Sequence, residues 1–186
     1  AAPPPPPLTP ERAGEPRATP VRGNPGGGQG FNDVCPGEEV LIGVAGEVRA
    51  NADYVGRLRG ICGGLDVALD SVNTVPGAVL PVRGALGGGG QFGATCPAGT
   101  AVVAYSGRAG ALMDQLVIHC AEVQRIGALL SPNPGAFPLQ PVGGNGGNPF
   151  ARVDCGERSF AVGVLIRAGD GVDGFGLLCT DIDLVP

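Results

Sequence analysis

The chain of 186 residues contains no lysine and no tryptophan, and it has only one histidine and one methionine. Its 12 basic residues are all arginine and are outnumbered by 17 acidic residues, which gives a net charge of −5. Nothing resembles a basic stripe that displaces counterions from phosphate, so we expect no nucleic-acid partner. No apolar run approaches the roughly 18 residues that span a bilayer, so we expect no membrane insertion.

The residue patterns of common catalytic and metal sites are also missing. There is no GxSxG elbow, no GK[ST] phosphate loop, no CxxC pair and no acidic series with EF-hand spacing. The lone histidine, His119, follows an apolar run on a predicted strand, where it is usually structural. The pairs Asp170/Asp173 and Asp181/Asp183 fall in a tight turn and in strand alternation. We therefore predict a protein that is not an enzyme and that binds no cofactor or metal.

Glycine, proline and short aliphatic runs dominate what is present. The chain has 35 glycines and 19 prolines, and the glycines recur at fixed places, as in turns rather than in disordered tracts. Valine, isoleucine and leucine occur in short runs typical of strands, and no segment shows a long 3.6-residue period. The sequence therefore predicts an all-β fold.

One sequence unit occurs three times along the chain. Each copy opens with a proline and a glycine-rich turn, followed by a phenylalanine, a cysteine, an aspartate and a second cysteine. The opening prolines recur at almost equal intervals, as Pro20, Pro81 and Pro141. The interval from the first cysteine to the aspartate is identical in every copy: Cys35 to Asp53, Cys96 to Asp114, and Cys155 to Asp173. We expect an arm, residues 1–19, and one domain, residues 20–186, with internal repeats at 20–80, 81–140 and 141–186.

Six cysteines allow fifteen connectivities, and threefold repetition selects one of them. The predicted disulfides are Cys35–Cys62, Cys96–Cys120 and Cys155–Cys179. Each closes a loop of some 25 residues and contributes about 3 kcal/mol on the chain-entropy model. Three such links indicate an oxidising compartment, and the first residues, Ala1-Ala2, are typical of a chain after signal-peptide removal. We therefore expect a secreted, extracellular protein.

The arm is rich in proline, and five consecutive prolines enforce polyproline II. The third repeat stops at Pro186 without the connector that follows the other two, and the segment from Leu8 to Thr19 supplies a counterpart. The arm is therefore expected to complete the third repeat, either of its own chain or of a neighbour. Exchange between neighbours is head-to-tail and propagates unless the rotation closes. The arm residues assigned to this contact are Pro3, Pro7, Leu8, Pro10, Pro16 and Thr19.

The third repeat reads PVGGNGGNPF (141–150) and then IRAGDGVDGFGLL (166–178), which places a glycine turn before a GxxxD loop. With these motifs in this order it resembles the jacalin-related lectins. The second repeat matches with GGGGQF (87–92) and GRAGALMDQLVI (107–118), whereas the first has RANAD (49–53) in place of GxxxD. The resemblance implies a β-prism of three four-stranded Greek-key sheets with pseudo-threefold symmetry. A weaker likeness extends to the vitelline-membrane outer-layer proteins.

In the family that this chain resembles, the GxxxD loop binds a hexose, with the aspartate accepting hydrogen bonds from two sugar hydroxyls. The resemblance thus implies two candidate sites, Gly110 with Asp114 and Gly169 with Asp173. The turns Gly88-Gly89 and Gly146-Gly147 are candidates for a second wall. The alternative is that each aspartate caps the turn before its strand, which its presence in all three repeats favours.

Two functions remain open on the sequence. The first is a secreted structural protein that self-assembles, as a homo-oligomer or an extracellular filament, through its arm; the scarcity of aromatic sugar platforms (only Tyr54 and Tyr105 besides phenylalanine) favours it. The alternative is an extracellular lectin that binds glycans through its GxxxD loops. Thr9 and Thr19 each precede proline, a context that suits O-glycosylation.

Overall fold

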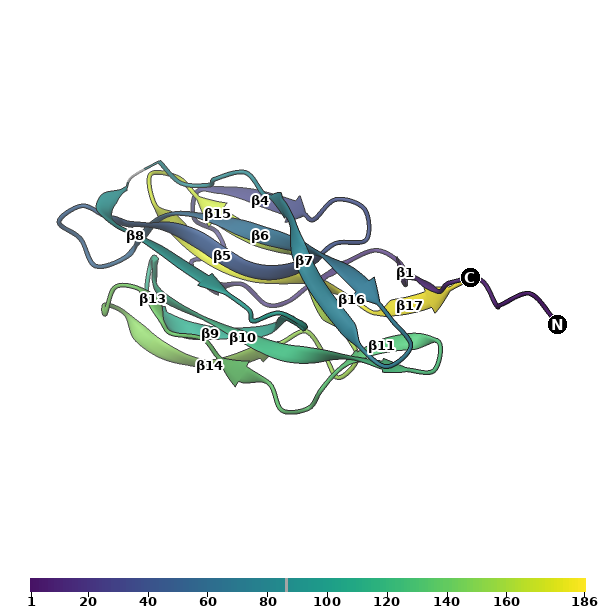
Figure 1. Cartoon of the computed structure of the whole chain (residues 1–186). Helices are drawn as coiled ribbons and strands as arrows, with labels where there is room; N and C mark the ends of the chain where they lie inside the picture. The colour runs from purple at the N-terminus through teal and green to yellow at the C-terminus, as the bar shows by residue number, and fades with distance from the viewer. Residues whose placement is uncertain (86) are drawn as a thin grey trace.

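The computed structural model describes residues 1–85 and 87–186, which form antiparallel sheets arranged as the three walls of a prism (Figure 1). The described residues contain no helix, and hence none long and apolar enough to cross a membrane. The predicted all-β fold is confirmed, and so is its β-prism architecture.

Each wall is built around one long hairpin. The first wall contains β5 (Val40–Arg49), β6 (Val55–Val67), β7 (Val72–Val79) and β8 (Gly88–Thr95). The second contains β9 (Thr100–Ala109), β10 (Met113–Ile126), β11 (Leu129–Pro132), β12 (Phe137–Pro138), β13 (Val142–Gly143) and β14 (Asn148–Asp154). The third contains β15 (Phe160–Ala168), β16 (Val172–Thr180), β4 (Gln29–Val34), β2 (Arg17–Ala18) and β3 (Arg22–Gly23). The short strands β17 (Ile182–Val185) and β1 (Thr9–Arg12) extend the sheet of the second wall beyond β11.

The walls do not coincide with the sequence repeats, because each repeat gives its first strand to the wall of the repeat before it. In the first wall the strand order is β7-β6-β5-β8, so that β8, from the second repeat, lies beside β5 in the Greek-key manner. Likewise β14 of the third repeat pairs with β9, and β4 of the first repeat pairs with β15. A glycine turn therefore lies against the hairpin of the preceding repeat.

The core fills the space between the walls. The three disulfides that repetition predicts are present, and five of their six cysteines are buried. Tyr105 is fully buried, with its hydroxyl 2.6 Å from the carbonyl oxygen of Pro20 and its ring edge-on to Phe150 and Phe175. Burial raises the pKa of the Tyr105 phenol to about 12, so the hydroxyl stays a donor that ties the N-terminal segment to the core.

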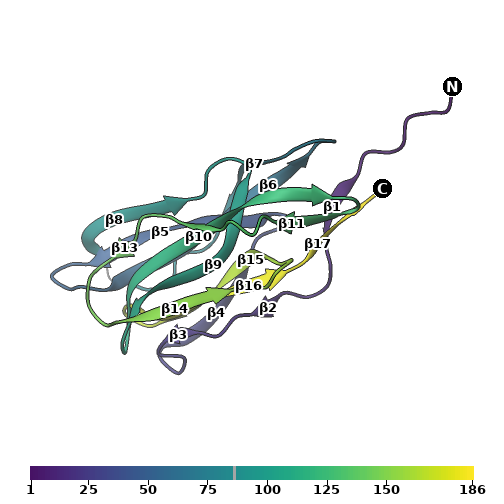
Figure 2. The same ribbon diagram turned by 90° about the horizontal axis from the view of Figure 1, so that it is seen from below.

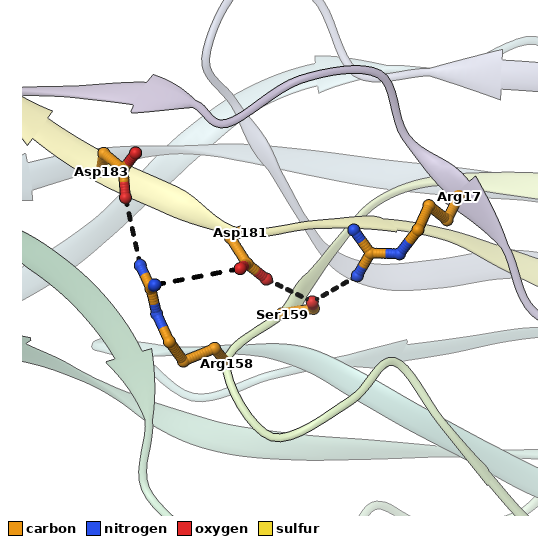
Figure 3. A network of polar contacts seen from close by, with 5 residues as sticks. All are labelled: Arg17, Arg158, Ser159, Asp181 and Asp183. Atoms are coloured by element: carbon orange, nitrogen blue, oxygen red, sulfur yellow. Dashed lines mark hydrogen bonds and ion pairs between the residues drawn. The ribbon is translucent and has the colours of Figure 1, made fainter.

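The N-terminal segment pairs with the C-terminal strands of its own chain, partly in the third wall and partly at the edge of the second. Strand β1 pairs with β17, and β2 and β3 pair with β16 (Figure 2). Figure 3 shows Arg17 donating to Ser159 (2.9 Å), which donates to Asp181 (2.5 Å), while Arg158 spans Asp181 and Asp183. The strand pairings of the N-terminal segment occupy the edge that the arm of this chain or of a neighbour was expected to fill.

The arm residues singled out in the sequence fall into two groups. Pro3 and Pro7 are exposed and lie outside any strand, whereas Leu8, Pro10 and Pro16 are half-buried against the body. Thr19 is buried, and its hydroxyl oxygen accepts a hydrogen bond from the Leu177 amide (2.9 Å). The side chain of Thr19 is thus enclosed in the folded chain, whereas Thr9 is exposed. O-glycosylation at these two residues stays a prediction.

Candidate functional site

Two hairpin loops carry an aspartate at the same position. Ala109 pairs with Met113 and Ala168 with Val172, which leaves three residues in the β9–β10 loop and three in the β15–β16 loop. Asp114 and Asp173 each follow the second pairing residue. The loop amides of Gly110 and Gly169 donate to the carbonyl oxygens two residues further on, both at 3.0 Å. The backbone thus contributes to the closure of both turns, and the Gly110 amide also hydrogen-bonds the Asp114 carboxylate, so the capping role stays an alternative for Asp114.

A glycine turn from the following repeat lies against each aspartate. Gly146 and Gly147 approach Asp114 so closely that a side chain on either glycine would overlap its carboxylate. Gly27 and Gly28 make the same approach to Asp173, with Gly28 at a φ of +52° and Gly147 at +64°, where glycine is favoured. The two sites are therefore Asp114 with Gly146-Gly147 and Asp173 with Gly27-Gly28.

The sequence reasoning missed Gly27 and Gly28. Their turn opens the first repeat, near the opposite end of the chain from Asp173, and it reaches the third repeat only because the N-terminal segment closes the prism. The signal was available: Gly146-Gly147 belongs to the repeat after Asp114, and a closed prism applies the same order to Asp173.

An arginine holds each of these turns in place. Arg108 donates from Nε to the Gly146 carbonyl (2.9 Å) and from Nη2 to the Gly147 carbonyl (2.8 Å). Arg167 does the same to Gly27 (2.8 Å) and Gly28 (2.9 Å). Within the described residues the backbone amides of Gly28 and Gly147 have no hydrogen-bond acceptor. Each site thus places an unused backbone donor beside a carboxylate acceptor.

A second carboxylate, that of Asp53, lies close to the Asp114 site. Burial and, after it, the charge of Asp53 raise the pKa of Asp114, while Arg108 and the Gly110 amide oppose the rise. Asp53 comes from the first repeat and accepts a hydrogen bond from the Asn145 amide (2.9 Å). It therefore holds the glycine turn of the Asp114 site from the other side.

Asp53 is not the counterpart of Asp114 and Asp173, although it lies at the same distance from its cysteine. Val48 pairs with Val55, which leaves residues 49–54 in the β5–β6 loop, three more than in the other two loops. The residue after Val55 is Gly56, and its carbonyl faces Gly84 as those of Asp114 and Asp173 face Gly143 and Gly23. The longer loop shifts Asp53 out of register, so the first repeat, which has RANAD in place of GxxxD, does not repeat the arrangement of Asp114 and Asp173.

The remaining predicted wall, Gly88-Gly89, lies beside the first-wall hairpin and has no aspartate next to it. Glu47 stands where Arg108 and Arg167 stand in the other walls, and it accepts hydrogen bonds from the Gly88 amide (3.0 Å) and Arg57 (2.8 Å). These contacts lower the pKa of Glu47, the Gly88 amide most of all. The first wall therefore offers neither the carboxylate nor the unused amide, and Gly88 and Gly89 do not belong to a site of this kind.

The long β5–β6 loop contacts both complete sites. Asp53 bonds the turn of the Asp114 site, and the ring of Tyr54 packs against Gly171 in the loop that precedes Asp173. Arg49 lies over the Tyr54 ring, 5.6 Å from its centroid, and donates to its hydroxyl. Tyr54 is thus the aromatic side chain nearest to the Asp173 loop among those that the sequence singled out.

The other polar residues singled out in the sequence already bond to protein groups. His119 is buried, with Nε2 at 2.8 Å from the Ser106 hydroxyl, and burial lowers its pKa. Asp181 and Asp183 bond Ser159 and Arg158. No group of three or more histidine, cysteine, aspartate or glutamate side chains suited to a metal ion occurs in residues 1–85 and 87–186.

No protein-family model and no curated protein sequence matches the chain. Solved structures do match, and they are jacalin-related lectins with a β-prism fold. Frutapin, a lectin from Artocarpus incisa, has a TM-score of 0.60 at 16% identity over 90% of this chain and 99% of that one. A mannose-binding jacalin-related lectin from Ananas comosus has a TM-score of 0.56 at 18% identity over 89% and 98%.

The agglutinin of Calystegia sepium has a TM-score of 0.55 at 18% identity over 90% of this chain and 97% of that one. Such low identities establish the shared fold. The resemblance read from the GxxxD loops is confirmed at that level, and the matches say nothing about the vitelline-membrane likeness.

Proposed function

We propose that this protein is a carbohydrate-binding protein that takes one hexose unit at each of two sites. The observation that carries the proposal is the repeated pairing of a carboxylate with an unused glycine amide, at Asp114 with Gly147 and at Asp173 with Gly28. The mannose-binding description of the Ananas comosus lectin, which shares the fold, makes mannose the first sugar to test.

The carboxylate and the glycine amide make different hydrogen bonds to the sugar. An ionised carboxylate accepts hydrogen bonds from two neighbouring sugar hydroxyls, and the glycine amide donates to an oxygen of the same ring. The absence of side chains on the turn lets the sugar approach the backbone. Arg108 and Arg167 contact the far side of the turn and fix the direction of its amides. Two sites on one chain also allow avidity for branched glycans.

The rest of the proposal follows from composition and chemistry. We take the protein to be non-enzymatic and secreted, and three disulfides support the oxidising compartment. The division at residues 19 and 20 stays a prediction. Assembly through the arm has no separate support, since the arm pairs within its own chain.

Calorimetric titration with methyl α-mannoside tests the proposal. The intact chain is expected to bind two sugars, each of Asp114→Asn and Asp173→Asn one, and the double variant none, because each substitution removes the charged acceptor. The matched control is Asp66→Asn, an exposed aspartate away from both loops, which should keep both sites. Absence of binding across a panel of hexoses, or binding that survives the double substitution, would overturn the proposal.

A further inference from the structure

One half-buried arginine has no partner. Ten of the 12 arginines make a hydrogen bond or an ion pair with another described group. Arg22 has none and is exposed to solvent, whereas Arg59 has none and is half-buried on the outer face of the first wall. A guanidinium that is partly shielded from water and lacks an acceptor points to a ligand that would supply one.

The strand register places Arg59 over a hollow. Arg59 lies opposite Ala45, and Ala45 lies opposite Gly93, so the row across the wall has almost no side chain beside the arginine. The next row runs from Arg57 to Glu47 to Gln91, and its long side chains extend further from the sheet than Ala45 and Gly93 do. The result is a groove of about 310 Å³ that Val82 and Phe92 also line. This volume lies at the lower end of the range for small-ligand sites.

The charges in the groove favour an anion. Glu47 is already bonded to Arg57 through Nη2 and to the Gly88 amide, whereas Nε of Arg57 is buried and has no acceptor among the described residues. Arg59 adds a positive charge that no carboxylate in the described chain balances. Because the whole chain carries a net charge of −5, this local excess is not part of a general attraction for anions.

This groove is a property of the first wall alone. The positions of Arg57 and Arg59 are held by Gln115 and Val117 in the second wall, as the pairing with Arg108 and Ser106 shows. In the third wall both positions are glycine, Gly174 and Gly176. The first wall, which lacks a hexose site, is thus the one that carries the cationic groove.

We propose that the groove binds an acidic sugar, a hexuronate, independently of the two hexose sites. The guanidinium of Arg59 takes the carboxylate in its planar fork. The amide of Gln91 and the carboxylate of Glu47 meet ring hydroxyls, and the exposed side chain of Val82 covers the apolar edge of the ring. The groove thus gives the protein a second ligand class at a separate surface.

Titration with glucuronate and with glucose, followed by amide NMR shifts of the intact chain, tests this proposal. Glucuronate should shift the signals of Arg59, Ala45 and Gln91, and glucose should leave them in place. Arg59→Ala should weaken glucuronate binding at least about tenfold, since hydrogen bonds to charged groups are among the stronger ones, and Arg59→Lys should restore part of it. Arg22→Ala is the matched control and should change nothing.

The outcomes separate this proposal from the preceding one. Glucuronate binding that persists in the Asp114→Asn/Asp173→Asn double variant supports the groove even where no hexose binds. Equal shifts with inorganic sulfate would make this an anion site only and overturn the sugar assignment. Shifts that map to the hairpin loops instead, or no glucuronate response in the groove, would overturn the proposal.

Discussion

The arginine that holds each glycine turn is expected to control sugar affinity without touching the sugar. In Arg108→Met the carbonyls of Gly146 and Gly147 lose donors at 2.9 and 2.8 Å, while the long apolar stem is kept. Because Arg108 is half-exposed, water replaces part of the loss, and the expected cost in unfolding free energy is about 1–2 kcal/mol. For a chain of this length Tm then falls by about 2–8 °C.

The effect on binding is larger than the effect on folding, because the amide of Gly147 must point at the sugar. Measured in an Asp173→Asn background, so that only the Asp114 site responds, mannoside affinity should fall about tenfold, the value of one misdirected hydrogen bond. Arg108→Lys keeps the charge but loses the planar fork of the guanidinium. Its mannoside affinity should therefore lie between that of Arg108→Met and that of the Asp173→Asn background. Arg22→Met serves as the control for removing an exposed arginine.

Calorimetry on these four variants tests whether Arg108 positions the glycine turn for sugar binding. An affinity of Arg108→Met equal to that of the background variant would refute the positioning role, whatever the change in Tm. A loss equal in Arg108→Met and Arg22→Met would trace the effect to net charge.

Four further predictions concern the charged groups and the N-terminal segment. Since the pKa of Asp114 is raised in the folded state, protonation favours folding, so the stability that this group contributes is present at low pH and is lost as pH rises through its pKa; Asp114→Asn should therefore keep or raise Tm at neutral pH. Mannoside affinity at this site should fall on acidification, and Asp53→Asn should move that fall to lower pH, as carboxyl NMR titration would show. Arg83→Ala removes a two-point pair with the buried Asp33 (2.8 and 2.6 Å) and should cost about 3 kcal/mol or more, lowering Tm by at least about 6 °C in a thermal melt. Deleting residues 1–7 should leave Tm unchanged, whereas deleting residues 1–18 uncovers the edges of β16 and β17 and should lower it; equal melts would contradict closure by the arm.

Repetition made much of this fold predictable. A unit kept three times indicates its own hairpins and selects one disulfide pattern, and both agree with the structure. Sequence could not say where the N-terminal segment pairs, because the edge of β17 is satisfied equally by the same chain or by a neighbour. Only the observed register between Thr9–Arg12 and Ile182–Val185 places it within the chain.

The sites were harder to derive, because spacing along the chain does not report register in a loop. The last paired residue before each hairpin loop follows the first cysteine of its repeat at the same interval in all three repeats. These residues are Val48, Ala109 and Ala168. Beyond that point the loop of the first repeat is longer, so its aspartate keeps its interval from the cysteine but loses its place beside a glycine turn. Glu47 in place of arginine was the visible sign of that change.

The most direct test of the two-site account is an amide NMR titration of the intact chain with methyl α-mannoside. The account predicts that the signals of Gly28 and Gly147 shift with the sugar, each with its neighbouring aspartate, while that of Gly88 stays in place. Shifts at Gly88, or none at Gly28 and Gly147 while the sugar binds elsewhere, would contradict it.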